Sequence, residues 1–125
     1  MEKTPITSAQ GAPPGGPYTP ALRWGELLFV SGQVGVDPAT GEPVEGDFAA
    51  EVRQVLSNVQ TLVEAGGSSM DKVLRATVYL TDMALFADMN AVYEQFFPEP
   101  RPTRSTVQVG LARQFRVEID VIAHT

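Results

Sequence analysis

The sequence predicts an α+β domain in which a mixed sheet is covered by two helices on one face. Three observations support this class: alternating apolar segments typical of strands, two segments with the apolar spacing of amphipathic helices, and an order in which strands and helices alternate before a final pair of strands. The chain has 125 residues and a mass of 13.5 kDa, which suits one core but not two. We therefore expect a single domain over residues 1–125.

The N-terminal residues carry the weakest pattern. Residues 1–15 are predicted to form a flexible or loop-like lead-in, and the glycines and prolines of residues 11–17 cannot continue a helix or an inner strand. The apolar run LLFVSG at residues 27–32 suits a buried strand, and an extra strand is expected closer to the N-terminus. The segment that follows marks turns, with Pro38, Gly41, Pro43 and Gly46 close together.

A change of apolar spacing predicts the first helix from Asp47 onward. Asp47 is a suitable N-cap and Gly66 a suitable stop. Apolar residues recur at three and four positions and give the helix one apolar face, which should lie on the sheet. The residues of this face are Val52, Val55, Leu56, Val59, Leu62 and Val63.

Residues 73–81 alternate as in a strand with one buried face. The side chains expected on the buried face are Leu74, Ala76, Val78 and Leu80, and those expected on the other face are Arg75, Thr77 and Tyr79. A second helix is predicted to begin near Asp82 and to stop by Pro98, because the proline ring blocks its continuation. Its apolar residues are Leu85, Phe86, Met89, Val92, Tyr93 and Phe96.

The last two alternating segments, residues 105–111 and 115–123, are joined by a few residues and are predicted to form an antiparallel hairpin. Alternation then places one set of residues on the core face: Val107, Val109, Val117, Ile119 and Val121. It leaves another set together on the opposite face: Arg104, Thr106, Gln108, Glu118 and Asp120. The helices cover only one face, so this second face is either solvated or in contact with another subunit. Because Tyr79 lies on it, we expect an oligomer.

The composition excludes several kinds of function. The net charge of -6 and the pI near 4.6 argue against a broad phosphate-binding surface, so nucleic acid is not an expected partner. The chain has no cysteine and a single histidine, His124, and we expect no metal site. No apolar run resembles a signal peptide or approaches the roughly 20 residues that span a bilayer. We therefore expect a cytoplasmic protein without a membrane partner.

Seven motifs occur in order along the chain: GPYTPA (16–21), LLFVSGQ (27–33), DPATGE (37–42), VRQVLSNVQTLVEAGG (52–67), VYLTDMALFADMNAVYEQFF (78–97), RPTRSTV (101–107) and VEIDVIA (117–123). Together they closely resemble the Rid family of reactive enamine and imine deaminases, also called YjgF/YER057c/UK114. The resemblance covers nearly the whole chain. It implies a chorismate mutase-like fold, a homotrimer with ligand clefts between neighbouring subunits, and no cofactor.

The resemblance also implies hydrolysis of 2-aminoacrylate, 2-aminocrotonate and the 2-imino acids formed from them to 2-keto acids and ammonia. Each substrate carries a carboxylate, and Arg104 corresponds to the family's carboxylate-binding arginine, since a guanidinium offers paired donors. Glu118 corresponds to the glutamate that places the attacking water, and a nearby arginine would favour its charged form. The alternative roles are a surface or interface salt bridge for Arg104 and a plain pair with Arg116 or Arg75 for Glu118.

Further residues match family positions around the cleft. Tyr18 would close the cleft over the substrate, or would instead pack the N-terminal strand. Ser31 and Gly32 match contacts at a strand end, where a glycine lets backbone groups approach a ligand. Asn90 is either a ligand contact or a structural hydrogen-bonding amide. The backbone N–H of Thr106 would help to hold the carboxylate.

Two departures from the family pattern concern the cleft. Many relatives read PYSQA where this chain has PYTPA, so Pro20 removes a backbone donor near Tyr18. After RSTV, relatives usually continue EVARLPKGALVEI, whereas QVGLARQFRVEI in this chain is shorter by a residue. If the shortening lies in the loop, Arg104 and Glu118 share a face. If it lies in a strand as a lost bulge, Glu118 is displaced.

Three functions follow from these observations. The first is hydrolytic deamination of small 2-imino acids, with Arg104 holding the carboxylate and Glu118 placing water. The second is binding of a small keto acid or related metabolite without turnover, as a sensor or regulator. The third is the RNA cleavage or translation inhibition linked to some relatives, which the acidic charge disfavours because phosphate binding depends on basic residues.

Overall fold

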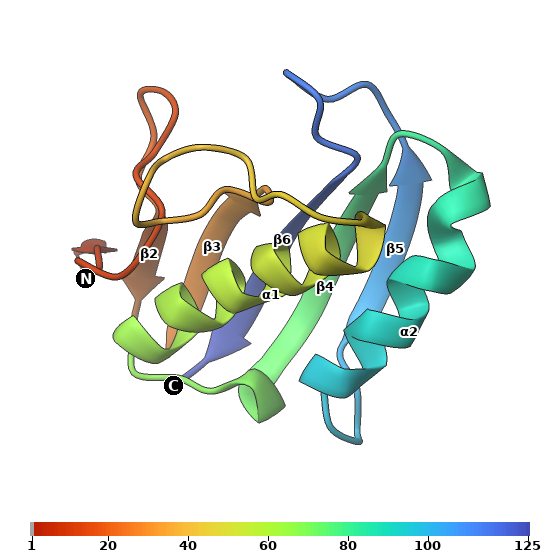
Figure 1. Cartoon of the computed structure of the whole chain (residues 1–125). Coiled ribbons are helices and arrows are strands. Elements are labelled where there is room, and N and C mark those ends of the chain that lie inside the picture. The colour runs from red at the N-terminus through yellow and green to blue at the C-terminus, as the bar shows by residue number, and fades with distance from the viewer. Residues whose placement is uncertain (1) are drawn as a thin grey trace.

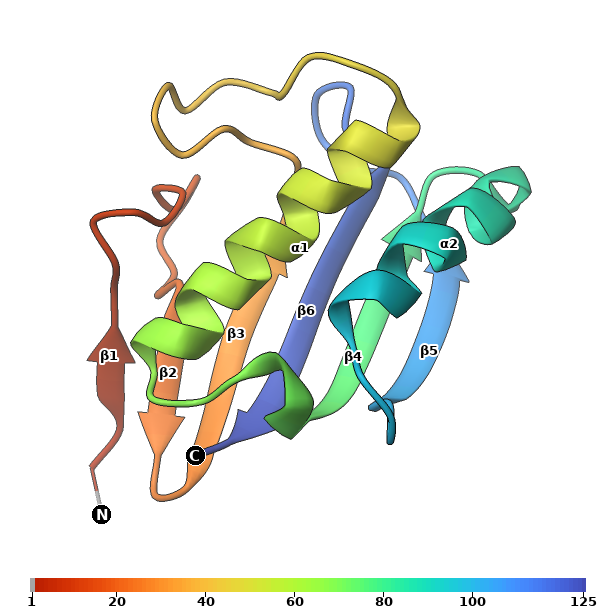
Figure 2. The ribbon, with the colours of Figure 1, turned by 60° about the horizontal axis from the view of Figure 1, so that its bottom comes forward.

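Residues 2–125 are described by the computed structural model, in which both helices pack on one face of a six-stranded sheet (Figures 1 and 2). Met1 of the expected domain lies outside the described residues. The strands are β1 (Thr4–Ile6), β2 (Ala21–Trp24), β3 (Leu27–Gln33), β4 (Val73–Leu80), β5 (Thr103–Gln108) and β6 (Val117–His124). The helices are α1 (Phe48–Ala65) and α2 (Phe86–Phe96), and the 3-10 turns η1 (Met70–Lys72) and η2 (Met83–Leu85) precede β4 and α2. These elements confirm the predicted α+β class.

The strand order is β1-β2-β3-β6-β4-β5, which shows that the predicted terminal hairpin is wrong. β4 pairs in parallel with β5 and antiparallel with β6, so it separates the two (Figure 2). The segment between β5 and β6 crosses the end of β4, where the Val109 N–H donates to the Leu80 carbonyl at 2.9 Å and the Thr81 N–H donates to the Arg116 carbonyl at 3.0 Å. A short connection is typical of a hairpin, but this one is long enough to span an intervening strand, because neighbouring strands lie only about 4.8 Å apart.

The strand order decides which side chains share a face. In the β4–β5 pair, Arg104 is the partner of Ala76 and Thr106 is the partner of Val78. Ala76 and Val78 are fully buried under the helices, so Arg104 and Thr106 also lie on the helix-covered face. In the β4–β6 pair, Glu118 lies opposite a side chain of the uncovered face. The prediction that Arg104 and Glu118 share one face is therefore wrong.

The same strand pairing also changes which residues of β5 are buried, compared with the prediction. Val107 is 41% exposed on the uncovered face, and Val109 is half-buried beyond the strand. Gln108 lies on the helix-covered face, where its amide oxygen accepts a hydrogen bond from the Met83 N–H at 2.9 Å. On β6 the prediction is confirmed, because the three residues expected in the core are buried: Val117, Ile119 and Val121.

The first helix begins and ends close to the predicted residues. Asp47 is the N-cap, and its Oδ1 accepts a hydrogen bond from the Ala50 N–H at 2.9 Å. The helix ends before Gly66, and Gly67 has a φ of +87°, a left-handed conformation that glycine adopts without steric cost. The apolar residues predicted for its buried face are each at most 1% exposed. The core therefore lies between α1 and the sheet.

Three local predictions need correction. Residues 4–6 of the expected lead-in form β1, which pairs with β2. Leu74 is 47% exposed rather than buried, because a register shift at the start of β4 breaks the alternation. Asp82 caps the turn η2 and not an α-helix, and α2 begins later, at Phe86.

The sheet face that α1 and α2 leave uncovered carries large apolar side chains. Trp24 and Phe29 are 48% and 39% exposed there, in addition to Val107 of β5. Exposed aromatic side chains on the neighbouring strands β2 and β3, together with Val107 at the β5 edge, are typical of contact with another protein surface. No helix among residues 2–125 is long and apolar enough to cross a membrane.

Candidate functional site

The predicted site residues fall into two groups on opposite faces of the sheet. The group on the uncovered side comprises Tyr18, Ser31, Gly32 and Glu118. The group on the helix-covered side comprises Asn90, Arg104 and Thr106. We call the hollow beside the first group the glutamate pocket and the hollow beside the second the arginine cavity.

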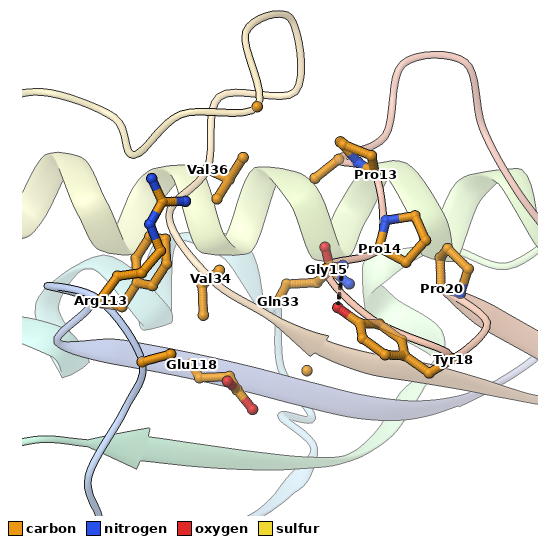
Figure 3. Close-up of a pocket in the computed structure, with 15 residues that line it drawn as sticks. Pro13, Pro14, Gly15, Tyr18, Pro20, Gln33, Val34, Val36, Arg113 and Glu118 are labelled. Atoms are coloured by element: carbon orange, nitrogen blue, oxygen red, sulfur yellow. Dashed lines mark hydrogen bonds between the residues drawn. The ribbon is translucent and has the colours of Figure 1, made fainter.

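The glutamate pocket has a volume of about 420 Å³ and lies where β3 ends and β6 begins. In Figure 3, Pro13, Pro14 and Tyr18 lie on one side of it, and Arg113 and Glu118 lie on the other. Most of the remaining lining is apolar. The pocket therefore places a carboxylate at the edge of a space suited to a small organic molecule.

A bulge in β3 brings Gly32 against Glu118. The register between β3 and β6 shifts between Val30 and Gln33, which adds a residue to β3 at this point. A Cβ atom on Gly32 would lie 2.8 Å from Cδ of Glu118, well inside the contact distance of two carbon atoms. The glycine is therefore needed for the carboxylate to keep its position.

The loop that carries Tyr18 is hydrogen-bonded to the same bulge of β3. The Ser31 hydroxyl donates to the Thr19 carbonyl at 2.7 Å, and the Ser31 N–H donates to the Pro20 carbonyl at 2.9 Å. The Gly15 N–H donates to the Tyr18 hydroxyl oxygen at 3.0 Å, which leaves the hydroxyl hydrogen free for another acceptor (Figure 3). Pro20 thus contributes an acceptor despite its missing N–H. Tyr18 is 48% exposed and does not pack as a core residue.

The surroundings of Glu118 favour its protonated form. Burial raises the pKa of the Glu118 carboxyl above its ordinary value, and the neighbouring Asp120 carboxylate raises it further. The expectation that an arginine would stabilise the charged form is wrong within the chain, because Arg104 lies on the other face of the sheet. A carboxylate with a raised pKa is a stronger base than an ordinary one and, once protonated, can return the proton.

A half-buried ion pair that the sequence analysis missed holds the start of β6. Glu51 of α1 is 7% exposed and accepts hydrogen bonds from the Arg116 backbone N–H at 2.8 Å and from its Nε at 2.7 Å. Arg75 donates to the Ser105 hydroxyl at 2.9 Å. Neither arginine forms the plain pair considered for Glu118, so the carboxylate remains available in the pocket.

The arginine cavity lies at the edge of the sheet beside α2 and has a volume of about 340 Å³. Its lining comprises Asn90, Tyr93, Glu94, Arg101, Pro102 and Arg104. The Arg104 guanidinium carbon lies 4.7 Å from the ring centroid of Tyr93 and 5.5 Å from that of Phe86, so two aromatic rings fix its position. The exposed Arg101 pairs with Glu99, as expected of a solvated charge at the rim.

Three buried polar atoms near Arg104 have no hydrogen-bond partner among residues 2–125. They are Asn90 Oδ1, the Tyr93 hydroxyl and Thr106 Oγ1. Buried polar groups in native proteins nearly always have partners, so a cluster of exceptions indicates a place where a ligand or water completes the bonding. The sequence analysis assigned Tyr93 to the core. Its position three residues after Asn90, on the same side of α2, was the signal that could have added it to the site.

The fold and these two hollows define a class of protein: a small α+β domain with a carboxylate pocket on one sheet face and a guanidinium cavity on the other. Among residues 2–125, no group of three or more His, Cys, Asp or Glu side chains is arranged to hold a metal ion. Residues 9–125 match the family described as Endoribonuclease L-PSP. The chain therefore belongs to this family, which is the YjgF or Rid family.

Three known proteins illustrate the similarity. A RutC family protein of Pyrococcus horikoshii is 44% identical over 95% of this chain and 96% of its own length. The 2-iminobutanoate/2-iminopropanoate deaminase of Escherichia coli K12 is 41% identical over 98% of each chain. The crystal structure of E. coli TdcF with bound serine is 38% identical, covers 98% of each chain and gives a TM-score of 0.91.

Replacement of Gly32 by alanine is expected to force Glu118 out of its position. The added Cβ would collide with the far end of the Glu118 side chain, which can rotate away, so the free energy of unfolding in urea should fall by less than the roughly 1–3 kcal/mol typical of an overpacked core. The Gly32→Ala, Glu118→Ala double variant should recover most of this loss. Gly110→Ala is the control, because a Cβ there meets no atom of residues 2–125 within 4 Å. An additive double variant would contradict the proposed collision.

Replacement of Asp120 by asparagine is expected to lower the pKa of Glu118. The like charge of Asp120 raises that pKa, so its removal shifts the titration of the Glu118 carboxyl to lower pH, while burial still holds it above the ordinary value. In the unaltered protein the Tyr79 hydroxyl donates a hydrogen bond of 2.7 Å to Asp120, and the asparagine side-chain oxygen can still accept this bond. Carbon-13 NMR titration of the carboxyl groups measures the shift. Asp88→Asn on α2 is the matched change of charge and should leave the Glu118 titration in place.

Proposed function

We propose that the protein hydrolyses small 2-imino acids to 2-keto acids and ammonia, in a cleft formed between neighbouring copies of the chain. The observation that carries this proposal is the separation of a half-buried guanidinium from a carboxylate with a raised pKa on opposite faces of one sheet. Arg104 can bind the substrate carboxylate, and Glu118 can accept and return a proton during hydrolysis. The similarity to a named imine deaminase supports the same reaction.

The opposite placement of the two groups suits a site shared between subunits. A cleft that contains both requires Arg104 of one chain and Glu118 of the next, so each chain gives one half of two different sites. Repetition of such a contact closes into a ring, and the family resemblance implies a ring of three. The apolar residues of the uncovered face, Trp24, Phe29 and Val107, support burial against another copy.

In this cleft Arg104 binds the substrate carboxylate through two parallel hydrogen bonds and fixes the imine carbon. Glu118 accepts a proton from a water molecule as the water oxygen bonds to the carbon of the protonated imine, and the electron pair of the C=N bond moves to the nitrogen to give a neutral carbinolamine. The protonated Glu118 then gives its proton to the nitrogen of the carbinolamine. The C–N bond breaks, ammonia leaves, and the carbinolamine hydroxyl passes its proton to the Glu118 carboxylate as the carbonyl forms. The raised pKa of Glu118 suits it to both transfers.

Binding of a keto acid without turnover is the second candidate function. TdcF has been crystallised with serine bound, and serine carries the same kind of carboxylate as an imino acid. An unreactive complex would use the Arg104 half of the cleft and need no base. Ribonuclease activity, which the family description names, has less support because the net charge of -6 disfavours phosphate binding.

Replacement of Arg104 and replacement of Glu118 are expected to lower the deaminase activity in different ways. A dehydratase generates 2-aminocrotonate, and semicarbazide traps the imino acid that the protein leaves unhydrolysed. Arg104→Ala should lower kcat/KM on the order of 10- to 100-fold, mainly through KM, because it loses charge-assisted bonds to the carboxylate. Glu118→Gln should lower kcat on the order of 100-fold or more, because it cannot accept the proton. If the unaltered protein forms keto acid no faster than buffer, the deaminase proposal is wrong.

A mixture of the two inactive variants is expected to regain activity. If Arg104→Ala and Glu118→Gln chains are unfolded together and refolded at equal amounts, random assembly should give about one intact cleft in four, because each cleft draws one residue from each neighbour. Separately refolded variants, mixed afterwards without exchange, are the control. No recovery in the co-refolded sample would show that the two residues do not act in one shared cleft.

A further inference from the structure

No acceptor among residues 2–125 receives the hydrogen of the Tyr93 hydroxyl. Tyr93 is 4% exposed, its ring packs on Phe97 at a centroid distance of 4.5 Å, and the guanidinium carbon of Arg104 lies 4.7 Å from its ring centroid. A phenylalanine ring would make both contacts. The hydroxyl is nevertheless buried without a hydrogen-bond partner among residues 2–125, an arrangement that opposes folding. A partner from outside the chain would account for it.

The surroundings of the hydroxyl indicate what this partner is. Tyr93 and Arg104 line the same cavity of about 340 Å³. The Thr106 hydroxyl, two residues after Arg104 on the same face of β5, is a second unpartnered hydroxyl, whereas the unpartnered atom of Asn90 is an amide oxygen that can only accept. A carboxylate has about four lone-pair positions, of which a guanidinium fork occupies two. Two acceptor positions therefore remain for hydroxyl donors on the neighbouring elements.

We propose that the Tyr93 hydroxyl donates a hydrogen bond to the carboxylate that Arg104 binds, so that Tyr93 is a substrate-binding residue as well as a packing one. The proposal rests on the proposed function for the identity of the anion, a small 2-imino or 2-keto acid. It assigns two roles to one side chain. The ring holds the guanidinium in place, and the hydroxyl supplies a third donor to the ligand.

The protonation state of Tyr93 agrees with a donor role. Burial raises the pKa of the Tyr93 hydroxyl above its ordinary value, and the charge of Arg104, together with the contact that its guanidinium makes with the hydroxyl oxygen, offsets only part of this effect. The hydroxyl therefore keeps its hydrogen at neutral pH. A tyrosinate, by contrast, would repel the carboxylate.

Binding of 2-oxobutanoate, measured by calorimetry on the full chain in its native assembly, tests the proposal without any need for turnover. Tyr93→Phe should weaken binding by about tenfold to a hundredfold, as expected for a lost hydrogen bond to a charged group. Binding of the neutral 2-oxobutanamide should change much less, because the bond to the carboxylate charge is absent. Equal binding of 2-oxobutanoate to the unaltered protein and Tyr93→Phe would overturn the proposal.

Thermal unfolding without ligand separates a binding role from a structural one. Tyr93→Phe removes a buried hydroxyl that has no partner in residues 2–125, so its Tm should stay the same or rise. Tyr79→Phe is the matched control for stability, because the Tyr79 hydroxyl donates to Asp120 at 2.7 Å and its loss should lower the Tm. A lower Tm for Tyr93→Phe would instead assign its hydroxyl a structural bond and contradict the proposal.

The outcomes distinguish this proposal from the deaminase proposal. If 2-oxobutanoate binds neither the unaltered protein nor Arg104→Ala, the carboxylate site and the role of Tyr93 both fail. If the ligand binds and Tyr93→Phe weakens it while no imino acid is hydrolysed, the role of Tyr93 stands and the deaminase proposal fails. If imino acids are hydrolysed but Tyr93→Phe binds normally, only the role of Tyr93 fails.

Discussion

The alternation of side chains along β4 is the constraint on which the rest of the site depends. Consecutive residues of a strand point to opposite faces, and paired residues of neighbouring strands point to the same face. Because β4 lies between β5 and β6, its register places Arg104 under the helices and Glu118 on the uncovered face. To bring them together, one strand would have to slip by a residue, which would turn its whole buried set outward. The separation of guanidinium and carboxylate is therefore as firmly fixed as the core.

Local elements could be predicted from the sequence, but their neighbours in the sheet could not. The apolar stripe of α1 and the alternating apolar residues of β6 both lie against the core. Their burial was therefore predicted correctly. β5 is an edge strand, and its single valine does not mark a core face, which explains the error at Val107. The family resemblance singled out Arg104 and Glu118 as candidates. It could not assign their faces, because strand order depends on pairing between distant segments.

Buried polar groups were the other part of the molecule that apolar patterns could not predict. Glu51 stands four residues before Val55 and seven before Asn58, which is the spacing of a buried helix face. Without a known partner, a carboxylate at such a position is expected to face solvent. The partner of Glu51 is Arg116, which is 65 residues away in the chain and therefore not visible in the local pattern. Tyr93 shows the opposite case. Its apolar spacing predicted burial correctly, and that same burial leaves its hydroxyl without a partner among residues 2–125.

The separation of Arg104 from Glu118 also has a chemical consequence. If the two side chains met within one chain, they would form an ion pair, which would lower the pKa of Glu118 and occupy the donors of Arg104. On opposite faces neither group is masked, and burial together with Asp120 raises the pKa of Glu118. In the proposed shared cleft, a substrate carboxylate lies at Arg104 and offsets its positive charge. The base would then keep a raised pKa at the moment of catalysis, since the arginine that approaches it arrives already paired with the substrate.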